Sequence, residues 1–233
     1  MTPSYYFSHP GYCDICETAV LFHSDYKWFR DHLLCSGCGS VPRERALMSV
    51  LRRYYPKYKS LSIHESSPGN RGVSPKLARE CRRYAYSHFF PGIPLGKKHP
   101  VRNELCESLE ALTFASNSVD IFITQDVLEH VFDPVAAFQE IARVLKPGGA
   151  HIFTVPLVRK TGPSERRAAK TDDGNVENLD LEAGFFACSK TRLCLSDRLR
   201  FGSGVMSTAW RIMRDYRQIH LKPCILRSHA CCS

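Results

Sequence analysis

Four cysteines near the amino end have the spacing of a metal site. Two CxxC pairs are separated by eighteen residues, and they supply Cys13, Cys16, Cys35 and Cys38. Four thiolates complete the tetrahedron of a structural zinc site and leave no open position for catalysis. The alternatives are four reduced, unliganded cysteines, which the doubled motif disfavours, or a histidine ligand from His23 or His32. Because residues 19–34 can form a small hairpin, residues 1–40 are predicted to be a zinc-ribbon-like unit that binds Zn²⁺.

Residues 118–149 predict a strand, a helix and a turn in succession. Val119–Thr124 is a short apolar run of the kind that forms a buried strand. Asp133 precedes Pro134, which is an N-cap followed by a proline at the first helical position. Helical spacing then places apolar side chains at Ala137, Phe138, Ile141, Val144 and Leu145. A second apolar run at 150–155 follows Pro147-Gly148-Gly149, so we expect a βαβ unit and a parallel, helix-covered sheet.

This stretch resembles the middle of a class I S-adenosylmethionine-dependent methyltransferase of the type 11-like group. The resemblance rests on Val119-Asp120, on Leu128-Glu129-His130 and on Leu145-Lys146-Pro147-Gly148-Gly149. It implies an α/β fold with a Rossmann-like sheet and helices on both faces, here over residues 41–183. It also implies S-adenosylmethionine as cofactor and methyl transfer to an unidentified acceptor, for which we expect a small molecule.

The resemblance also implies positions for the cofactor contacts. Glu65 ends the first predicted strand, 61–65, and Gly69 lies in the loop 66–72 that takes the place of the family's glycine-rich loop. Glu107 follows the third predicted strand, 101–106, where a carboxylate can accept a hydrogen bond from the adenine amino group. Asp126 ends the fourth strand. The second strand, 84–90, ends in Ser87-His88-Phe89-Phe90, without the carboxylate that commonly binds the ribose hydroxyls in this family.

His130 is the candidate general base. Asp126, Glu129 and His130 are the polar side chains nearest the expected reaction centre, because ligands bind at the carboxyl ends of strands in open α/β sheets. Histidine has an intrinsic pKa suited to proton transfer. A structural role, in which His130 caps the loop, is the favoured alternative. Methyl transfer needs mainly in-line positioning of the acceptor, and a base only where the acceptor must lose a proton.

Composition and charge limit the remaining possibilities. The 233-residue chain has a formal net charge of +9, and residues 184–233 hold nine Lys or Arg against two Asp or Glu. We therefore expect a divergent, basic, cysteine-containing tail at 184–233. The arginines of a predicted helix at 42–55 are expected to form a solvated face. No apolar run approaches a membrane span and no secretory signal is visible, so the expected location is cytoplasmic.

Two other functions stay open at this point. One is a methyltransferase-like protein that binds a ligand but has lost catalysis, which the absent ribose carboxylate favours. The other is a zinc-ribbon protein that binds or methylates RNA, which the basic tail favours. Neither the methyl acceptor nor the oligomeric state follows from the sequence.

Overall fold

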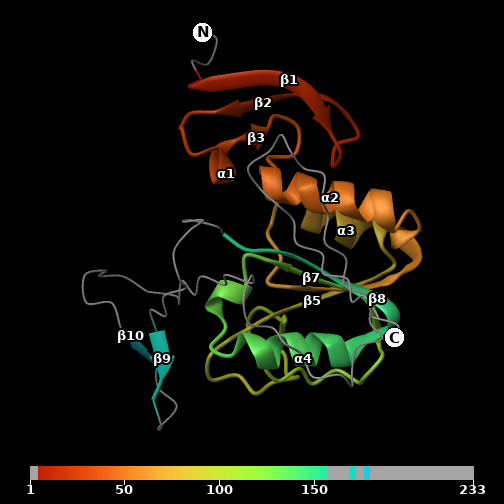
Figure 1. Cartoon of the computed structure of the whole chain (residues 1–233), viewed down its shortest axis with the longest axis vertical. Helices are drawn as coiled ribbons and strands as arrows, with labels where there is room; N and C mark the ends of the chain where they lie inside the picture. Colours follow the sequence, from red (N-terminus) through yellow and green to blue (C-terminus); the bar gives the residue numbers. More distant parts are fainter. Residues whose placement is uncertain (1–4, 157–167, 172–175, 179–233) are drawn as a thin grey trace, which may run out of the picture.

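The computed structural model describes residues 5–156, 168–171 and 176–178. They form a small antiparallel sheet at the amino end, a helical layer, a parallel sheet and a second helical layer (Figure 1). The predicted division at residues 183 and 184 and the predicted tail lie outside the described residues. None of the described helices has the length and apolar character needed to cross a membrane.

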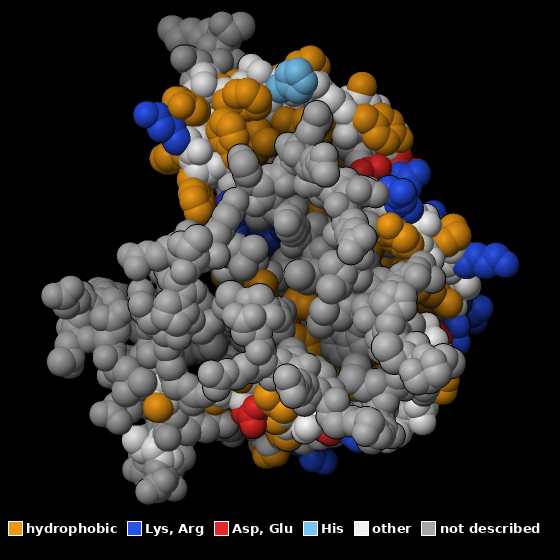
Figure 2. Space-filling view, viewed as in Figure 1, with side chains coloured by type: hydrophobic (Ala, Val, Ile, Leu, Met, Phe, Trp, Pro, Cys, Tyr) orange, Lys and Arg blue, Asp and Glu red, His pale blue; other side chains and the backbone are white. Residues whose placement is uncertain are grey.

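The amino-terminal segment is a three-stranded antiparallel sheet in the order β1-β2-β3. Its elements are β1 (Phe7–Cys13), β2 (Thr18–Ser24), α1 (Phe29–His32) and β3 (Leu34–Cys35). The hairpin predicted between the cysteine pairs corresponds to β2 and β3, with α1 inserted between them. Apolar side chains gather on the outer part of this segment (Figure 2), where Tyr6, Tyr12, Tyr26 and Trp28 are more than half exposed. The inner face packs on α2, as described below.

The central sheet has five parallel strands in the order β6-β5-β4-β7-β8. They are β4 (Ser62–Ser66), β5 (Arg83–His88), β6 (Leu105–Cys106), β7 (Val119–Gln125) and β8 (Leu145–Thr154). A separate pair consists of β9 (Ala168–Lys170) and β10 (Val176–Asn178). The chain order reverses between β4 and β7, which makes their carboxyl ends the switch point where ligands bind in sheets of this kind.

Helices cover both faces of this sheet, as the resemblance implied. On one face lie α2 (Pro42–Tyr54) and α3 (Val73–Glu80), and on the other lies α4 (Pro134–Val144) (Figure 1). The central strand β7 shows why both faces are needed. Ile121 and Ile123 pack toward α2 and α3, whereas Phe122 packs toward α4, since successive strand residues point to opposite faces.

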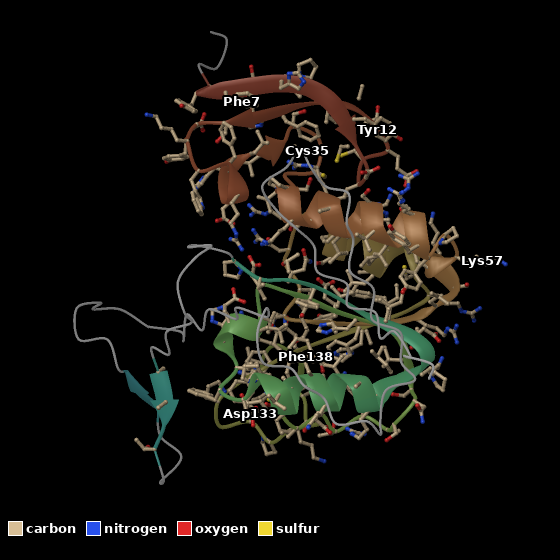
Figure 3. All side chains as sticks on the ribbon, in the orientation of Figure 1. Phe7, Tyr12, Cys35, Lys57, Asp133 and Phe138 are labelled. Atoms are coloured by element: carbon tan, nitrogen blue, oxygen red, sulfur yellow. The ribbon has the colours of Figure 1, made fainter. Side chains whose placement is uncertain are left out.

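The helix α4 forms as its sequence predicts. The Asp133 carboxylate caps it by accepting hydrogen bonds from the backbone N–H groups of Val135 and Ala136, at 2.9 and 3.1 Å. The predicted apolar side chains at 137, 138, 141 and 144 are buried, and Phe138 points from α4 toward the sheet (Figure 3). The Asp133 cap and the apolar stripe together fix where this helix starts and which face it buries.

Two predicted strands have different lengths in the structure. The strand predicted at 101–106 is reduced to Leu105–Cys106, and Val101 is 87% exposed. The reason is local, because the His99 ring accepts hydrogen bonds from the N–H groups of Val101 and Arg102 and turns the chain. Conversely, β8 begins at Leu145 instead of Ala150, with a bulge against β7.

Two loop-forming residues explain the early start of β8. Leu145 was predicted on the apolar stripe of the helix, but it is the first residue of β8, and the ammonium group of Lys146 pairs with Asp120 of β7 at 2.9 Å. A side chain at Gly149 would place its Cβ 2.9 Å from the Asp120 carbonyl oxygen, so only glycine lets the two strands approach here. The Lys146–Asp120 pair and the bulge therefore replace the simple turn.

Two buried histidines make the fold sensitive to acid. His64 of β4 and His151 of β8 hydrogen-bond Ser87 and Thr124, each at 2.9 Å, within the layer beneath α4. Burial disfavours the charged imidazolium, which lowers the pKa of His64 to about 4 and that of His151 to about 3. Both rings are therefore neutral in the folded protein near neutral pH.

We predict that stability falls as the pH drops below about 6.5. There the unfolded chain takes up protons on these two rings and the folded chain does not, so unfolding becomes easier by about 1.4 kcal/mol per pH unit for each histidine, down to the folded pKa. Urea unfolding at pH 7.5, 6.5, 5.5 and 4.5 measures this slope. A His151→Gln variant should show a shallower slope than the wild type, and parallel slopes would contradict the assignment.

Candidate functional site

The four predicted metal ligands come together. The sulfur atoms of Cys13, Cys16, Cys35 and Cys38 all lie within 4.8 Å of one another. The Cys16–Cys35 and Cys13–Cys38 sulfur pairs are 3.7 and 3.9 Å apart. A tetrahedron with Zn–S bonds of about 2.3 Å has sulfur–sulfur edges of about 3.8 Å, so the observed spacing fits a zinc ion. We call residues 5–40 the cysteine segment.

The surroundings of the cluster suit four thiolates. Within the described residues the cluster contains no histidine; the rings of His23 and His32 instead pack on Tyr5 and Tyr26. The guanidinium of Arg45 lies close enough to Cys13, Cys35 and Cys38 for their charges to interact, and it donates to the Leu33 carbonyl at 3.1 Å. A fixed cation beside the cluster offsets part of the excess negative charge of a zinc ion with four thiolates.

The cysteine segment packs directly on α2. Cys13, Ile15 and Cys35 share one apolar core with α2 and the central sheet, and Cys35 lies on the side of the small sheet that faces α2 (Figure 3). A Cβ at Gly37 would lie 2.9 Å from the Cys16 sulfur, so a larger residue would push into the cluster. The cluster is therefore an integral part of the fold.

Glu65 ties together the carboxyl ends at the switch point. Its carboxylate accepts hydrogen bonds from Ser74 and Gln125, each at 2.8 Å, and from the Tyr84 hydroxyl at 2.7 Å. The residue is completely buried, and this burial raises the pKa of its carboxyl group although the three hydrogen bonds oppose the shift. The side chain thereby joins β4 to β5, to β7 and to the start of α3.

The loop after β4 also follows a strained path. Ser67 and Gly72 have φ angles of +53° and +63°. A Cβ at Gly72 would lie 2.6 Å from the Glu44 carboxylate of α2, which is too close. A Cβ at Gly69 would lie 3.7 Å from the same carboxylate, which is an ordinary contact distance. The glycine that the backbone requires is therefore Gly72, and the predicted contact Gly69 lies in the same loop without that constraint.

Glu107 lies at the end of β6 and organises the following loop. Its carboxylate accepts hydrogen bonds from the backbone N–H of Thr113 at 2.9 Å and from the Thr113 hydroxyl. The side chain is 3% exposed. At the neighbouring end of β5 stands His88, whose pKa is lowered mainly by burial. A neutral imidazole can both donate and accept, so it can hydrogen-bond a hydroxyl group.

Asp126 is held by residues that the sequence analysis did not assign to the site. It follows β7 with a φ of +55°, and its carboxylate pairs with Arg30 of α1 and Arg43 of α2. The expectation of a solvated arginine face on α2 is wrong for Arg43, whose side chain is 20% exposed, and for Arg45, which is partly buried beside the cysteines. It holds for Arg52 and Arg53, which are exposed. Helical spacing puts Arg43 and Arg45 at the start of α2, away from Arg52 and Arg53. Their surroundings become apparent only once the cysteine segment is placed against the helix.

The segment after Asp126 contains two titratable groups. Glu129 is 5% exposed, and burial, its largest cause, raises the pKa of the carboxyl group to about 7. The His130 ring lies 4.0 Å from it, and burial lowers the pKa of that ring. A carboxyl group that titrates near neutrality can exchange a proton, so Glu129 is a second candidate base beside His130.

Comparison with known proteins identifies the central part of this fold. Residues 67–153 match a family model described as a methyltransferase domain. They span β5 to β8 and include three of the four predicted cofactor contacts, Gly69, Glu107 and Asp126. The match covers less than half of the chain, and it shows that this segment is similar to methyltransferase domains.

Several methyltransferases resemble parts of the chain. The glycine/sarcosine/dimethylglycine N-methyltransferase of Actinopolyspora halophila is 30% identical over 90 residues, which are 39% of this chain and 16% of that protein. The ubiquinone biosynthesis O-methyltransferase of Parvibaculum lavamentivorans is 41% identical over 44 residues, 19% of this chain and 17% of that protein. The chain thus spans less than a fifth of these curated relatives.

A solved structure also matches at low similarity. The putative sarcosine dimethylglycine methyltransferase from Galdieria sulphuraria has 22% identity and a TM-score of 0.37, covering 49% of this chain and 46% of that one. The parallel strand order and the match over residues 67–153 support a methyltransferase-like fold for this part of the chain.

The segment that matches the methyltransferase-domain model contains residues that fit S-adenosylmethionine. The loop 66–72 brings backbone near the switch point, and Gly72 leaves no space there for a side chain. Glu107 offers a buried carboxylate at the end of β6. The ribose position lacks a carboxylate, but the neutral His88 can hydrogen-bond hydroxyl groups.

We predict that the cysteine cluster holds one zinc ion per chain. Replacing Cys16 with serine removes one thiolate, so zinc affinity should fall at least tenfold. Colorimetric zinc release against a chelator measures this. Cys106→Ser is the control, because it makes the same substitution at a cysteine that lies in β6, outside the cluster. Equal zinc retention in Cys16→Ser and wild type would contradict the assignment.

Proposed function

We propose that this protein transfers a methyl group from S-adenosylmethionine to a small-molecule acceptor. The observation that carries this proposal is the family match over residues 67–153, which lies on a five-stranded sheet in the order β6-β5-β4-β7-β8. The names of the partial relatives support a small acceptor, since they include glycine, sarcosine and ubiquinone-pathway methyltransferases.

The proposed cofactor contacts lie along the carboxyl edge of this sheet. Glu107 is proposed to accept a hydrogen bond from the adenine amino group, and the backbone of the loop around Gly69 to approach the methionine end. Beneath that loop, Glu65 of β4 accepts hydrogen bonds from the start of α3, from β5 and from the end of β7. Asp126 is proposed to border the methyl-transfer position on the far side of the switch point.

The chain's own contribution to the reaction is orientation. When bound, the cofactor supplies an electrophilic methyl group on its sulfonium. The protein residues hold the acceptor in line with that group and exclude water, which is the main requirement of such a transfer. Where the acceptor must lose a proton, Glu129 or His130 is positioned to receive it. We further propose that the four cysteines hold a structural zinc ion, since four thiolates leave no coordination position for substrate.

One observation favours a second candidate function. The end of β5 carries His88 where related enzymes commonly carry a ribose-binding carboxylate. A protein with a weakened cofactor site could retain the fold as a binding module without catalysis. Cofactor affinity decides between the two functions.

We predict that the zinc-loaded protein binds S-adenosylhomocysteine with micromolar affinity. Glu107→Gln should weaken binding about tenfold or more, because the amide presents one donor where the carboxylate only accepts. Isothermal titration calorimetry measures both affinities. Glu104→Gln provides a matched control, since it removes the same charge from the residue that directly precedes β6. A folded wild-type protein without measurable binding would contradict the methyltransferase function.

A further inference from the structure

Four charged side chains form a closed ring at the carboxyl edge of the sheet. Asp31 accepts from Arg30 at 2.9 Å and from Arg43 at 2.6 Å. Asp126 pairs with Arg43 at 3.2 Å and with Arg30, which closes the ring. Two of these residues come from α1 of the cysteine segment, one from α2 and one from the end of β7. The ring therefore joins the cysteine segment to the predicted cofactor edge.

This ring differs from ordinary surface ion pairs. The four side chains are only 14 to 33% exposed, and every charge meets two partners of opposite sign. Isolated exposed pairs contribute little, but a partly buried network loses much more when one member is removed, because a charge then stays buried without its partner. Removal of the Arg30 guanidinium would leave both aspartates with one arginine between them.

The ring holds Asp126 in a conformation that the turn needs. The residue has a left-handed backbone, with φ at +55°, and its N–H donates to the Thr154 carbonyl at 3.0 Å. The Thr154 hydroxyl donates to the other carboxylate oxygen at 3.0 Å. At this point the chain leaves β7 and enters the segment with Glu129 and His130. The direction of that segment thus depends on the orientation of the Asp126 carboxylate.

The ring also connects this turn to the cysteine cluster. The helix α1 lies between β2 and β3, and β3 ends at Cys35, one of the four candidate ligands. The short helix of four residues has no buried residue of its own, so the segment around the cluster must hold it in place. Without a metal to join the two cysteine pairs, α1 would lose that support, and Arg30 and Asp31 would leave the ring.

We propose that Arg30 is a positioning residue for the methyltransferase site and that it couples metal binding to cofactor binding. This inference rests on the proposed function, because it assigns Asp126 to the border of the cofactor site. The cysteine segment is then a working part of the enzyme: zinc orders α1, α1 presents Arg30, and Arg30 fixes Asp126. By thermodynamic linkage, zinc must strengthen cofactor binding by the same factor by which the cofactor strengthens zinc binding.

The first experiment measures S-adenosylhomocysteine affinity in zinc-loaded variants. Arg30→Ala should weaken binding by about fivefold or more, within the usual range of coupling between sites. Arg30→Lys should restore part of the affinity, because it returns the charge without the second donor. The matched control is Arg52→Ala. Arg52 also joins α2 to the cysteine segment, through the Asp14 carbonyl and Glu17, but it lies outside the ring, so its variant should bind like the wild type.

A double-mutant cycle distinguishes positioning from general loss of structure. If Arg30 acts through Asp126, Arg30→Ala should add little to the effect of Asp126→Asn on binding. In the wild type, saturating S-adenosylhomocysteine should also slow zinc loss to a chelator. It should raise zinc affinity by the same factor by which zinc raises the affinity for S-adenosylhomocysteine. In the Arg30→Ala variant, S-adenosylhomocysteine should leave zinc affinity nearly unchanged. A purely structural arginine would lower the melting temperature without changing either quantity.

The outcomes separate the two proposals. A wild-type protein that does not bind S-adenosylhomocysteine would overturn the proposed function, and this inference with it. A wild-type protein that binds, with equal affinity in Arg30→Ala, would overturn the inference alone. Additive effects of Arg30→Ala and Asp126→Asn would also overturn it, because independent effects mean that Arg30 does not act through Asp126.

Discussion

Helix α2 is the element on which the rest of the structure depends, because it is packed on two sides. Leu47, Met48, Val50 and Leu51 are buried in one core that includes Ile63 and Ile121 of the sheet and Cys13 and Cys35 of the cysteine segment. A helix that buries residues around so much of its circumference needs a layer on each side. One layer is the parallel sheet, and the other is the cysteine segment. The four cysteines therefore lie in the layer that covers α2 on the side opposite the sheet.

The same helix carries the polar contacts between the two layers. At its start, Glu44 accepts a hydrogen bond from the Val41 N–H at 2.8 Å and lies against Gly72 of the loop after β4. Arg43 reaches Asp126, and Arg45 reaches the cysteines. Three consecutive charged residues at the start of this helix thus meet the loop after β4, the end of β7 and the cysteine cluster. A change in how the cysteine segment sits on α2 would be transmitted to all three.

The sequence was sufficient for the features whose signals are local. The Asp133 cap with its apolar stripe correctly predicted α4, and the doubled CxxC spacing predicted four sulfurs that meet. The apolar run at 119–124 and the family resemblance at 61–65 correctly predicted two strands of the central sheet. The family motifs predicted the parallel sheet with helices on both faces. Each of these signals lies within a few residues or within a motif of fixed spacing, so no knowledge of distant contacts was needed.

The features that the sequence could not predict depend on distant partners. The Arg30–Asp126 pair joins residues 96 positions apart, and the Lys146–Asp120 pair joins residues 26 positions apart. The strand at 101–106 is shortened because the His99 ring accepts from the two N–H groups of 101 and 102, a side-chain conformation that no propensity reveals. Burial is equally nonlocal: the raised pKa of Glu129 comes from packing around it.

Internal hydrogen bonding limits how the predicted carboxylates can act at the cofactor edge. Glu65 receives three hydrogen bonds, Glu107 receives two from Thr113, and Asp126 is paired with two arginines. Each carboxylate oxygen can accept more than one bond, so a ligand can still be added, but it would find these groups already oriented. Such side chains cannot move to meet a ligand without breaking contacts to neighbouring elements. The edge is thus preorganised, and its shape is set by the partners of these carboxylates, one of which belongs to the cysteine segment.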